Sequence, residues 1–333
     1  MRHGSAVAAL TIAALAAPLA TTAVAQDAVT AAAPVATAPA PAPPAAPKKG
    51  KLTIRTEQDA ALVRSRVKVR GTLTPYVAGQ KVIVRFYRGE KKKLRVVELK
   101  VRRDGKVGRF TVGYAPKKTG RLTVRAVHRA TPELVSITAK GIGVDVLPRS
   151  VSPGDRGPAV RILQRQLAKR GYVVGERGLF DARTARAVVA FRKVAGMART
   201  SQANSAVFDK LARGGGYFKV KFPKHGRHVE ADISKQALAL IGEGGKVERI
   251  YPTSSGAPAT PTILGSFRVY RKDLGTNAKG MVHSSYFIRG YAIHGYKDVP
   301  VYNASHGCLR VPVPDAMSIF RWVRYGTRVD TYR

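Results

Sequence analysis

The chain has 333 residues, of which 59 are Lys or Arg and 20 are Asp or Glu, so its formal net charge is +39. This length predicts two or three domains, and a hydrophobic content of 44% with a mean hydropathy of -0.14 excludes both a multi-span membrane protein and a wholly disordered chain. A single cysteine excludes an intrachain disulfide, a CxxC redox pair and a zinc finger. The basic surplus is typical of proteins that work beside a polyanion, such as nucleic acid, an anionic membrane or an acidic wall polymer.

Residues 1–25 have the pattern of a signal peptide. Arg2 and His3 precede an uncharged, alanine-rich stretch that closes with Ala23-Val24-Ala25, the small-x-small sequence of a signal-peptidase site. We therefore predict export. The alternative is an uncleaved anchor, and only then would a membrane be a partner. Export and the lack of a nucleic-acid-binding motif both argue against nucleic acid as a partner.

Residues 26–50 are rich in Ala and Pro and predict an extended linker. Residues 51–148 then alternate apolar and basic side chains with a period of two, in short runs separated by turn signals such as Arg103-Asp104-Gly105. This pattern predicts an antiparallel β-sandwich of immunoglobulin-like architecture. The segment holds 24 Lys and Arg against 7 Asp and Glu, a net charge of about +17. We expect this segment to be a spacer or an adhesion module without catalytic residues.

Residues 152–214 have a helical period. Pro158 predicts the first turn of one helix, Asp181 caps a second, and a third short helix covers about 206–211. The segment resembles the small three-helix peptidoglycan-binding domain, a similarity carried by these residues: Gly154, Gly157, Val160, Leu163, Gln164, Leu167, Gly178, Phe180, Asp181, Thr184, Ala187, Val188 and Phe191. The resemblance implies that the segment holds the protein on peptidoglycan.

Residues 217–333 return to strands, one of them predicted over 267–270, and contain Cys308. A thiol is nucleophilic only as the thiolate, so catalysis needs a basic or cationic neighbour. His306 is close in sequence, His294 can approach through a folded loop, and the charge of Arg310 favours the thiolate. Taken alone, the cysteine could equally be a reactive thiol or an inert core residue.

The spacing around Cys308 resembles the catalytic family of the L,D-transpeptidases (YkuD-like). The resemblance is carried by His294-Gly295, nine further residues and then the run from Ser305 to Arg310, and upstream by Thr260-Pro261-Thr262, Gly265, Phe267, Met281, Tyr286 and Ile293. This sequence inserts Ile263-Leu264 before the glycine of the family's Thr-Pro-Thr-Gly pattern, which puts the shape of one strand edge in doubt.

The resemblance implies that Cys308 is the nucleophile and that His294 is its base, held through its other ring nitrogen by the carbonyl of Gly295. His306 and Gly307 would belong to the catalytic loop and supply oxyanion N–H groups with Cys308. Substrate contacts are expected from these side chains: Ser305, Arg310, Tyr286 and Met281. The implied reaction is acyl transfer without a metal or organic cofactor. Cys308 releases D-Ala from a tetrapeptide stem, and an amine of a second stem resolves the thioester as a 3→3 cross-link.

The sequence thus predicts a mainly β, multidomain protein that is secreted and associated with the cell wall. Its expected partners are peptidoglycan stems and glycan, together with anionic wall polymers. With water as the acceptor, the same site would be an L,D-carboxypeptidase. Two functions of a different class stay open: a non-catalytic wall-binding scaffold, and a zinc site built from His283, His294, His306 and Cys308.

Overall fold

The computed structural model describes residues 45–333. The predicted signal peptide at 1–25 and most of the predicted linker at 26–50 lie outside the described residues. No helix within 45–333 is long and apolar enough to cross a membrane.

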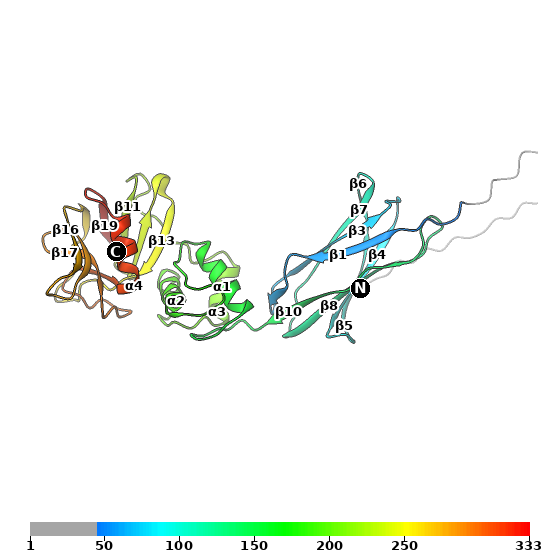
Figure 1. Cartoon of the computed structure of the whole chain (residues 1–333), viewed down its shortest axis with the longest axis horizontal. Helices are drawn as coiled ribbons and strands as arrows, with labels where there is room; N and C mark the ends of the chain where they lie inside the picture. Colours follow the sequence, from blue (N-terminus) through cyan, green and yellow to red (C-terminus); the bar gives the residue numbers. More distant parts are fainter. Residues whose placement is uncertain (1–44) are drawn as a thin grey trace, which may run out of the picture. The chain divides into compact units, whose positions relative to one another are not determined.

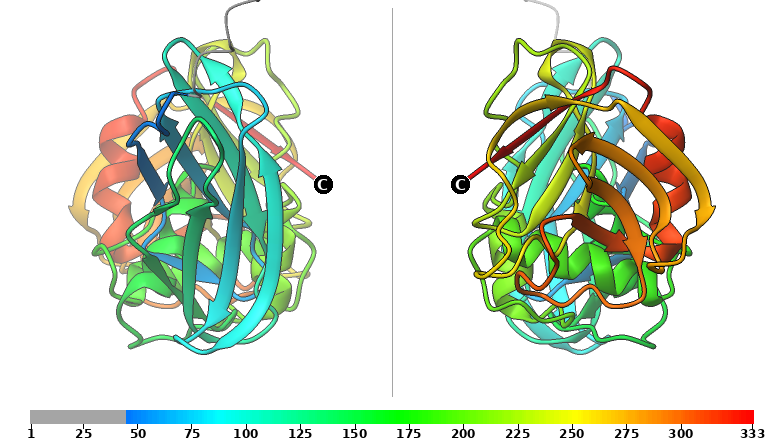
Figure 2. Two further views of the ribbon diagram at one scale, coloured as in Figure 1. Left: turned by 90° about the vertical axis from the view of Figure 1, so that its right-hand side faces the viewer. Right: turned by 90° about the vertical axis from the view of Figure 1, so that its left-hand side faces the viewer.

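Residues 51–147 form an immunoglobulin-like β-sandwich (Figure 1; Figure 2, left view). One sheet has the strand order β1-β3-β7-β6 and the other β2-β10-β8-β4-β5, with β9 paired to β8. The predicted alternation is visible along β3, where Val67 and Val69 are buried while Lys68 and Arg70 face solvent. The strands are β1 Lys51–Thr56, β2 Ala60–Leu62, β3 Val67–Thr74, β4 Lys81–Arg88, β5 Lys92–Lys100, β6 Arg102–Asp104, β7 Val107–Tyr114, β8 Gly120–His128, β9 Ile137–Thr138 and β10 Ile142–Leu147.

Three helices follow: α1 Pro158–Ala168, α2 Ala182–Val194 and α3 Ser205–Ala212. Pro158 opens α1, where its missing N–H costs nothing. The Asp181 carboxylate accepts the N–H of Thr184 at 2.7 Å and caps α2 as the sequence predicts. Asn204 caps α3 in the same way through the N–H of Val207.

The C-terminal segment contains two further sheets. One has the order β13-β12-β11-β19-β14 and the other β15-β16-β17-β18, with α4 packed on β16 and β17 (Figure 2, right view). Their elements are β11 His228–Asp232, β12 Ala237–Ile241, η1 Glu243–Gly245, β13 Val247–Pro252, β14 Gly265–Arg268, β15 Arg271–Thr276, β16 Val282–Ile288, β17 Tyr291–Tyr296, β18 Leu309–Pro312, α4 Val313–Trp322 and β19 Arg328–Tyr332.

The strand predicted over 267–270 is wrong in its position. β14 covers Gly265–Arg268, and Val269 and Tyr270 lie outside it. The N–H of Val269 still donates to Thr327, near β19, whereas the N–H of Tyr270 donates to Tyr286 in β16. The chain therefore changes from one sheet to the other at this point, a switch that a period of two cannot reveal.

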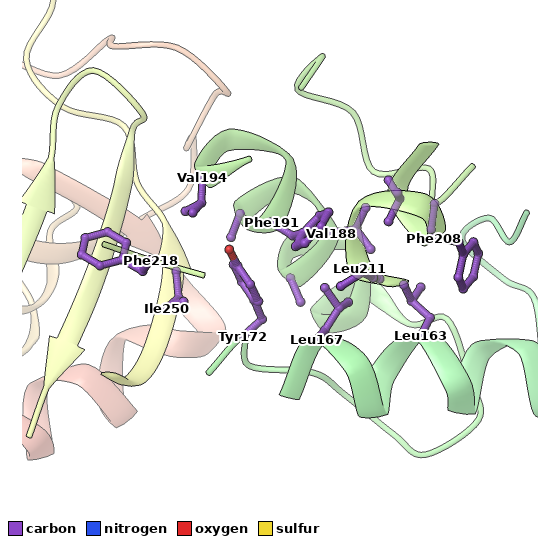
Figure 3. Close-up of a cluster of buried hydrophobic side chains, with 14 of the residues drawn as sticks. Leu163, Leu167, Tyr172, Val188, Phe191, Val194, Phe208, Leu211, Phe218 and Ile250 are labelled. Carbon is purple, nitrogen blue, oxygen red and sulfur yellow. The ribbon is translucent and has the colours of Figure 1, made fainter. Parts of the chain in front are cut away.

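The helices share one buried core with the sheet β13-β12-β11-β19-β14 (Figure 3). Tyr172 and Phe191 meet edge to face with ring centroids 5.6 Å apart, and both belong to the same cluster as Phe218 and Ile250. The N–H of Ile250 also donates to Gly171 at 2.8 Å. These contacts fix α2 against β13, the strand that leads toward the catalytic loop.

Candidate active site

The pairing of β17 with the edge strand β18 brings the two residues predicted to be reactive into one part of the sheet, with His294 in β17 and Cys308 just before β18. These strands run parallel, with His294 opposite Arg310 and Ile293 opposite Leu309. Cys308 stands just before β18 and so lies beside the start of β17. Its Sγ is 3.8 Å from the carbonyl oxygen of Gly290. The parallel pairing thus joins two positions that are fourteen residues apart in the sequence.

The His294 ring is buried, with 3% of the residue exposed, and Nδ1 lies 2.9 Å from the carbonyl oxygen of Gly295. This bond assigns the proton to Nδ1 and leaves the lone pair on Nε2. Gly295 is required at this position because a Cβ would stand 2.7 Å from the Cβ of Ala316, on α4. The glycine lets β17 approach α4 closely and so holds His294 in position.

The loop before Cys308 is braced from within. The hydroxyl of Ser305 donates to the carbonyl of Cys308 at 2.6 Å and accepts the N–H of Gly307 at 3.1 Å. Only 1% of Ser305 is exposed, and both of these hydrogen bonds lie within the loop, so its side chain braces the loop. Gly307 has a φ of 108°, and a Cβ there would overlap the ring of Tyr291. Its N–H is already bonded to the hydroxyl of Ser305.

The Thr-Pro-Thr segment supports the same loop. Thr260 donates its hydroxyl to the carbonyl of Ser305 at 3.0 Å, and Thr262 donates to that of Gly307 at 2.8 Å. The extra residues Ile263 and Leu264 are accommodated before β14, since the Ile263 carbonyl accepts the hydroxyl of Thr331 at 2.7 Å. Gly265 then pairs in regular register with Thr331. The insertion therefore leaves both the strand edge and the loop support in place.

Met281, Tyr286 and Ala292 form a small buried cluster against which Cys308 packs. Met281 and Tyr286 are 8% and 5% exposed, so they form a wall beside the sulfur. The guanidinium of Arg271 lies 3.9 Å from the centroid of the Tyr286 ring. Met281 and Tyr286, from which substrate contacts are expected, are thus brought to the cysteine by β16 and the residue directly before it.

Burial favours the neutral forms of both Cys308 and His294. It raises the pKa of the Cys308 thiol, and this effect exceeds the lowering by a backbone hydrogen bond from Ala292 and by the charges of Arg310 and Lys279. Burial likewise lowers the pKa of His294, against the raising effect of its bond to Gly295, and Arg310 lowers it further. The expectation that Arg310 favours the thiolate is right in direction, but burial outweighs it.

Arg310 and His306 have different surroundings. The Arg310 guanidinium lies 4.2 Å from the centroid of the Tyr296 ring, and that ring stands edge-on to His294 at 5.7 Å. His306 is exposed on the loop. Sequence reasoning missed Tyr296, although it follows His294 by two residues and so shares its face of the strand. It also missed Lys279, which sits in a hairpin turn and has no sequence signal.

The alternative of a zinc site, which the sequence leaves open, finds no support in the geometry of residues 45–333. Within residues 45–333, no group of three or more His, Cys, Asp or Glu side chains is placed to hold a metal ion. Nδ1 of His283 accepts the N–H of Gly275 at 3.0 Å, and its ring lies 5.8 Å from that of Phe320. His283 therefore stabilises the β15–β16 hairpin and packs against α4.

Residues 226–330 match the model of the L,D-transpeptidase catalytic domain, and residues 156–211 match that of a putative peptidoglycan binding domain. The crystal structure of an L,D-transpeptidase from Xylanimonas cellulosilytica is 32% identical, with a TM-score of 0.51. The match covers 56% of this chain and 98% of that one. The chain belongs to the L,D-transpeptidase family.

As a member of this family, the protein is a peptidoglycan-acting enzyme of acyltransferase type, and peptidoglycan is its partner. Domains that act on peptidoglycan indicate an extracytoplasmic location. An L,D-transpeptidase from Stackebrandtia nassauensis is 18% identical, covering 56% of this chain and 96% of that chain, with a TM-score of 0.36. One from Mycobacterium smegmatis is 12% identical, covering 85% and 100%, with a TM-score of 0.28. No curated protein sequence matches the chain.

Proposed function

We propose that this chain is an exported, cysteine-dependent L,D-transpeptidase that forms 3→3 cross-links, with Cys308 as the acylated residue. The observation that carries the proposal is the position of His294 in β17, which pairs with the strand that Cys308 directly precedes, with Nδ1 turned to the carbonyl of Gly295. Because the lone pair is then on Nε2, the ring is set to accept a proton from the thiol.

The first step acylates the enzyme. Sγ of Cys308 attacks the carbonyl that joins the third stem residue to the terminal D-Ala. The thiol proton passes to Nε2 of His294 and then to the leaving amine, so the C–N bond breaks as the thioester forms. Since the resting pair is neutral, this transfer takes place once substrate is bound.

The second step consumes the thioester. A side-chain amine of a second stem attacks the acyl carbon, His294 takes the proton of that amine, and the thiolate leaves and is reprotonated. The proposed oxyanion donors are the N–H groups of His306 and Cys308, since that of Gly307 is bonded to Ser305. We assign Met281 and Tyr286 to the donor pocket and Arg310 to the edge of the site.

The test is incubation of the protein with a disaccharide-tetrapeptide, with products read by mass. A cross-linked dimer and free D-Ala support the proposal, whereas tripeptide without dimer identifies an L,D-carboxypeptidase. Cys308→Ala should abolish both products while the protein stays folded. Residual turnover within about tenfold of wild type, a loss of only about 1.4 kcal/mol, would show that Cys308 is not the nucleophile.

We further propose the division of the chain into a signal peptide at 1–25, a linker at 26–50 and three domains at 51–148, 152–214 and 217–333. We assign adhesion to anionic wall polymers to the β-sandwich. Five of its seven acidic side chains already pair with Lys or Arg, and the remaining cations far outnumber the acids. Such a surface attracts polyanions through its summed potential.

A further inference from the structure

A groove of about 440 Å³ lies between α2 and the catalytic segment. One wall is the face of α2 that carries Ala185 and Val189, which are four residues apart and so lie on one side of the helix. The opposite wall is the loop after β17, with Lys297, Val299 and Val301. A volume of this size suits a small ligand or a few residues of an extended peptide.

Two contacts fix α2 to the catalytic segment beside the groove. Lys193 on α2 donates from Nζ to the carbonyl of Thr253 at 2.9 Å, and Arg186 pairs with Asp315 of α4 at 3.0 Å. The helices and the five-stranded sheet also share a buried core (Figure 3). The groove is therefore a preformed feature, and a ligand in it would touch the peptidoglycan-binding helices and the catalytic segment together.

Tyr296 connects the groove to the catalytic pair. It lines the groove, and its ring also contacts His294 at 5.7 Å and the guanidinium of Arg310 at 4.2 Å. Tyr296 and Cys308 stand at opposite ends of the paired strands β17 and β18, about four residues or about 13 Å apart. An extended peptide of about four residues covers this distance.

The charged and apolar side chains that line the groove indicate which kind of ligand it binds. Of the thirteen lining residues three are cationic and none is acidic. The charge of Arg186 is paired with Asp315 and Lys193 is bonded to Thr253, whereas Lys297 is exposed at the rim. Valine and proline side chains form most of the remaining surface. The groove thus offers an ammonium group above an apolar floor, which suits a short peptide with a carboxylate and small apolar side chains.

We infer that this groove binds the acceptor stem peptide of peptidoglycan, with Lys297 holding a stem carboxylate. The inference rests on the proposed function and names the partner of its second step. His294 must take the proton of the attacking amine, so the acceptor enters from the side of His294. Tyr296 lines the groove and also contacts His294, so it connects the groove to that side of the site.

The test separates binding from chemistry. Cys308→Ala protein is titrated with a soluble stem tripeptide and with the same tripeptide amidated at its carboxylates. We expect the free carboxylate form to bind at least about tenfold more tightly, and Lys297→Glu to remove this difference. Lys246→Glu is the matched control, since Lys246 is also exposed but lies in the β12–β13 turn, outside the groove lining. Equal binding of the two peptides, or equal effects of the two variants, would overturn the inference.

A second, kinetic experiment uses the protein with Cys308 unchanged. With disaccharide-tetrapeptide as donor, Lys297→Glu should raise the KM for the acceptor at least about tenfold and lower the ratio of dimer to released D-Ala. Val189→Trp, which fills the groove from α2, should have the same effect. If wild type forms neither dimer nor free D-Ala, the proposed function fails, and the binding experiment still decides on the groove. If turnover is normal and unaffected by either variant, the groove inference alone is wrong.

Discussion

Nζ of Lys193, on the second helix of the peptidoglycan-binding segment, donates a 2.9 Å hydrogen bond to the carbonyl of Thr253 in the catalytic segment. Thr253 in turn donates its hydroxyl to the carbonyl of Arg310 at 2.7 Å, two residues beyond Cys308. The helices therefore support the strand that carries the catalytic loop through two consecutive hydrogen bonds. The lysine is almost fully buried, with 3% exposed.

This burial makes the stability depend on pH. Burial, with a smaller contribution from Arg199, lowers the pKa of Lys193 from 10.5 to about 7. Between these values the unfolded chain holds more protons at this site than the folded chain, so the contribution of Lys193 to the free energy of unfolding rises with pH. We expect Lys193→Met to gain stability relative to wild type at pH 7 and to lose part of this advantage by pH 9. Urea unfolding at both values measures it, and a pH-independent difference would contradict the burial argument.

His294 should be the base and His306 should not. We expect His294→Ala to slow acylation of Cys308 by about 10² to 10⁴, the usual contribution of a general base. His306→Ala should stay within about tenfold of wild type, because His306 is exposed and contributes its backbone to the loop. Single-turnover release of D-Ala checks both variants, with circular dichroism as the folding control. The reverse order of effects would exchange the two roles.

The charge of Arg310 should lower the pKa of the Cys308 thiol, against the larger raising effect of burial. Removing that charge in Arg310→Ala should raise the pKa of Cys308 further and move the pH profile of alkylation by iodoacetamide to higher pH. The wild-type profile should itself lie above that of a cysteine peptide. Lys246→Ala serves as the control for loss of a distant charge. An unchanged profile in Arg310→Ala would show that the guanidinium does not act on the sulfur.

Adhesion by the β-sandwich should depend on salt. The Debye length falls from about 10 Å at 0.1 M to about 3 Å at 1 M, so binding of the full chain to native walls should weaken about tenfold or more over this range. Changing the exposed Lys91, Lys92 and Lys93 together to Glu should weaken binding at low salt. Turnover of a soluble stem peptide should be unaffected. If walls stripped of anionic polymer bind the chain equally well, the β-sandwich is only a spacer.

Local signals in the sequence determined much of this protein. Alternation along β3 predicted the sandwich strands, Asp181 marked the start of α2, and the spacing from His294 to Cys308 identified the catalytic family. These features could be predicted because side-chain period, capping chemistry and motif spacing act over a few residues of chain. The requirement for Gly295 and Gly307 was also visible as a motif, although its physical cause was not.

Only the tertiary structure decided which side chains face the site and which support it. Ser305 is adjacent to His306 of the sequence motif, yet the fold buries its side chain, which braces the loop. Tyr296 and Lys279 lie at the site although no sequence motif marks them. The neutral state of Cys308 and His294 follows from desolvation, which depends on the total packing around each group and not on its sequence neighbours. The contact of Lys193 with Thr253 joins residues sixty positions apart. Such a contact forms only when α2 and β13 share a core, which no local pattern encodes.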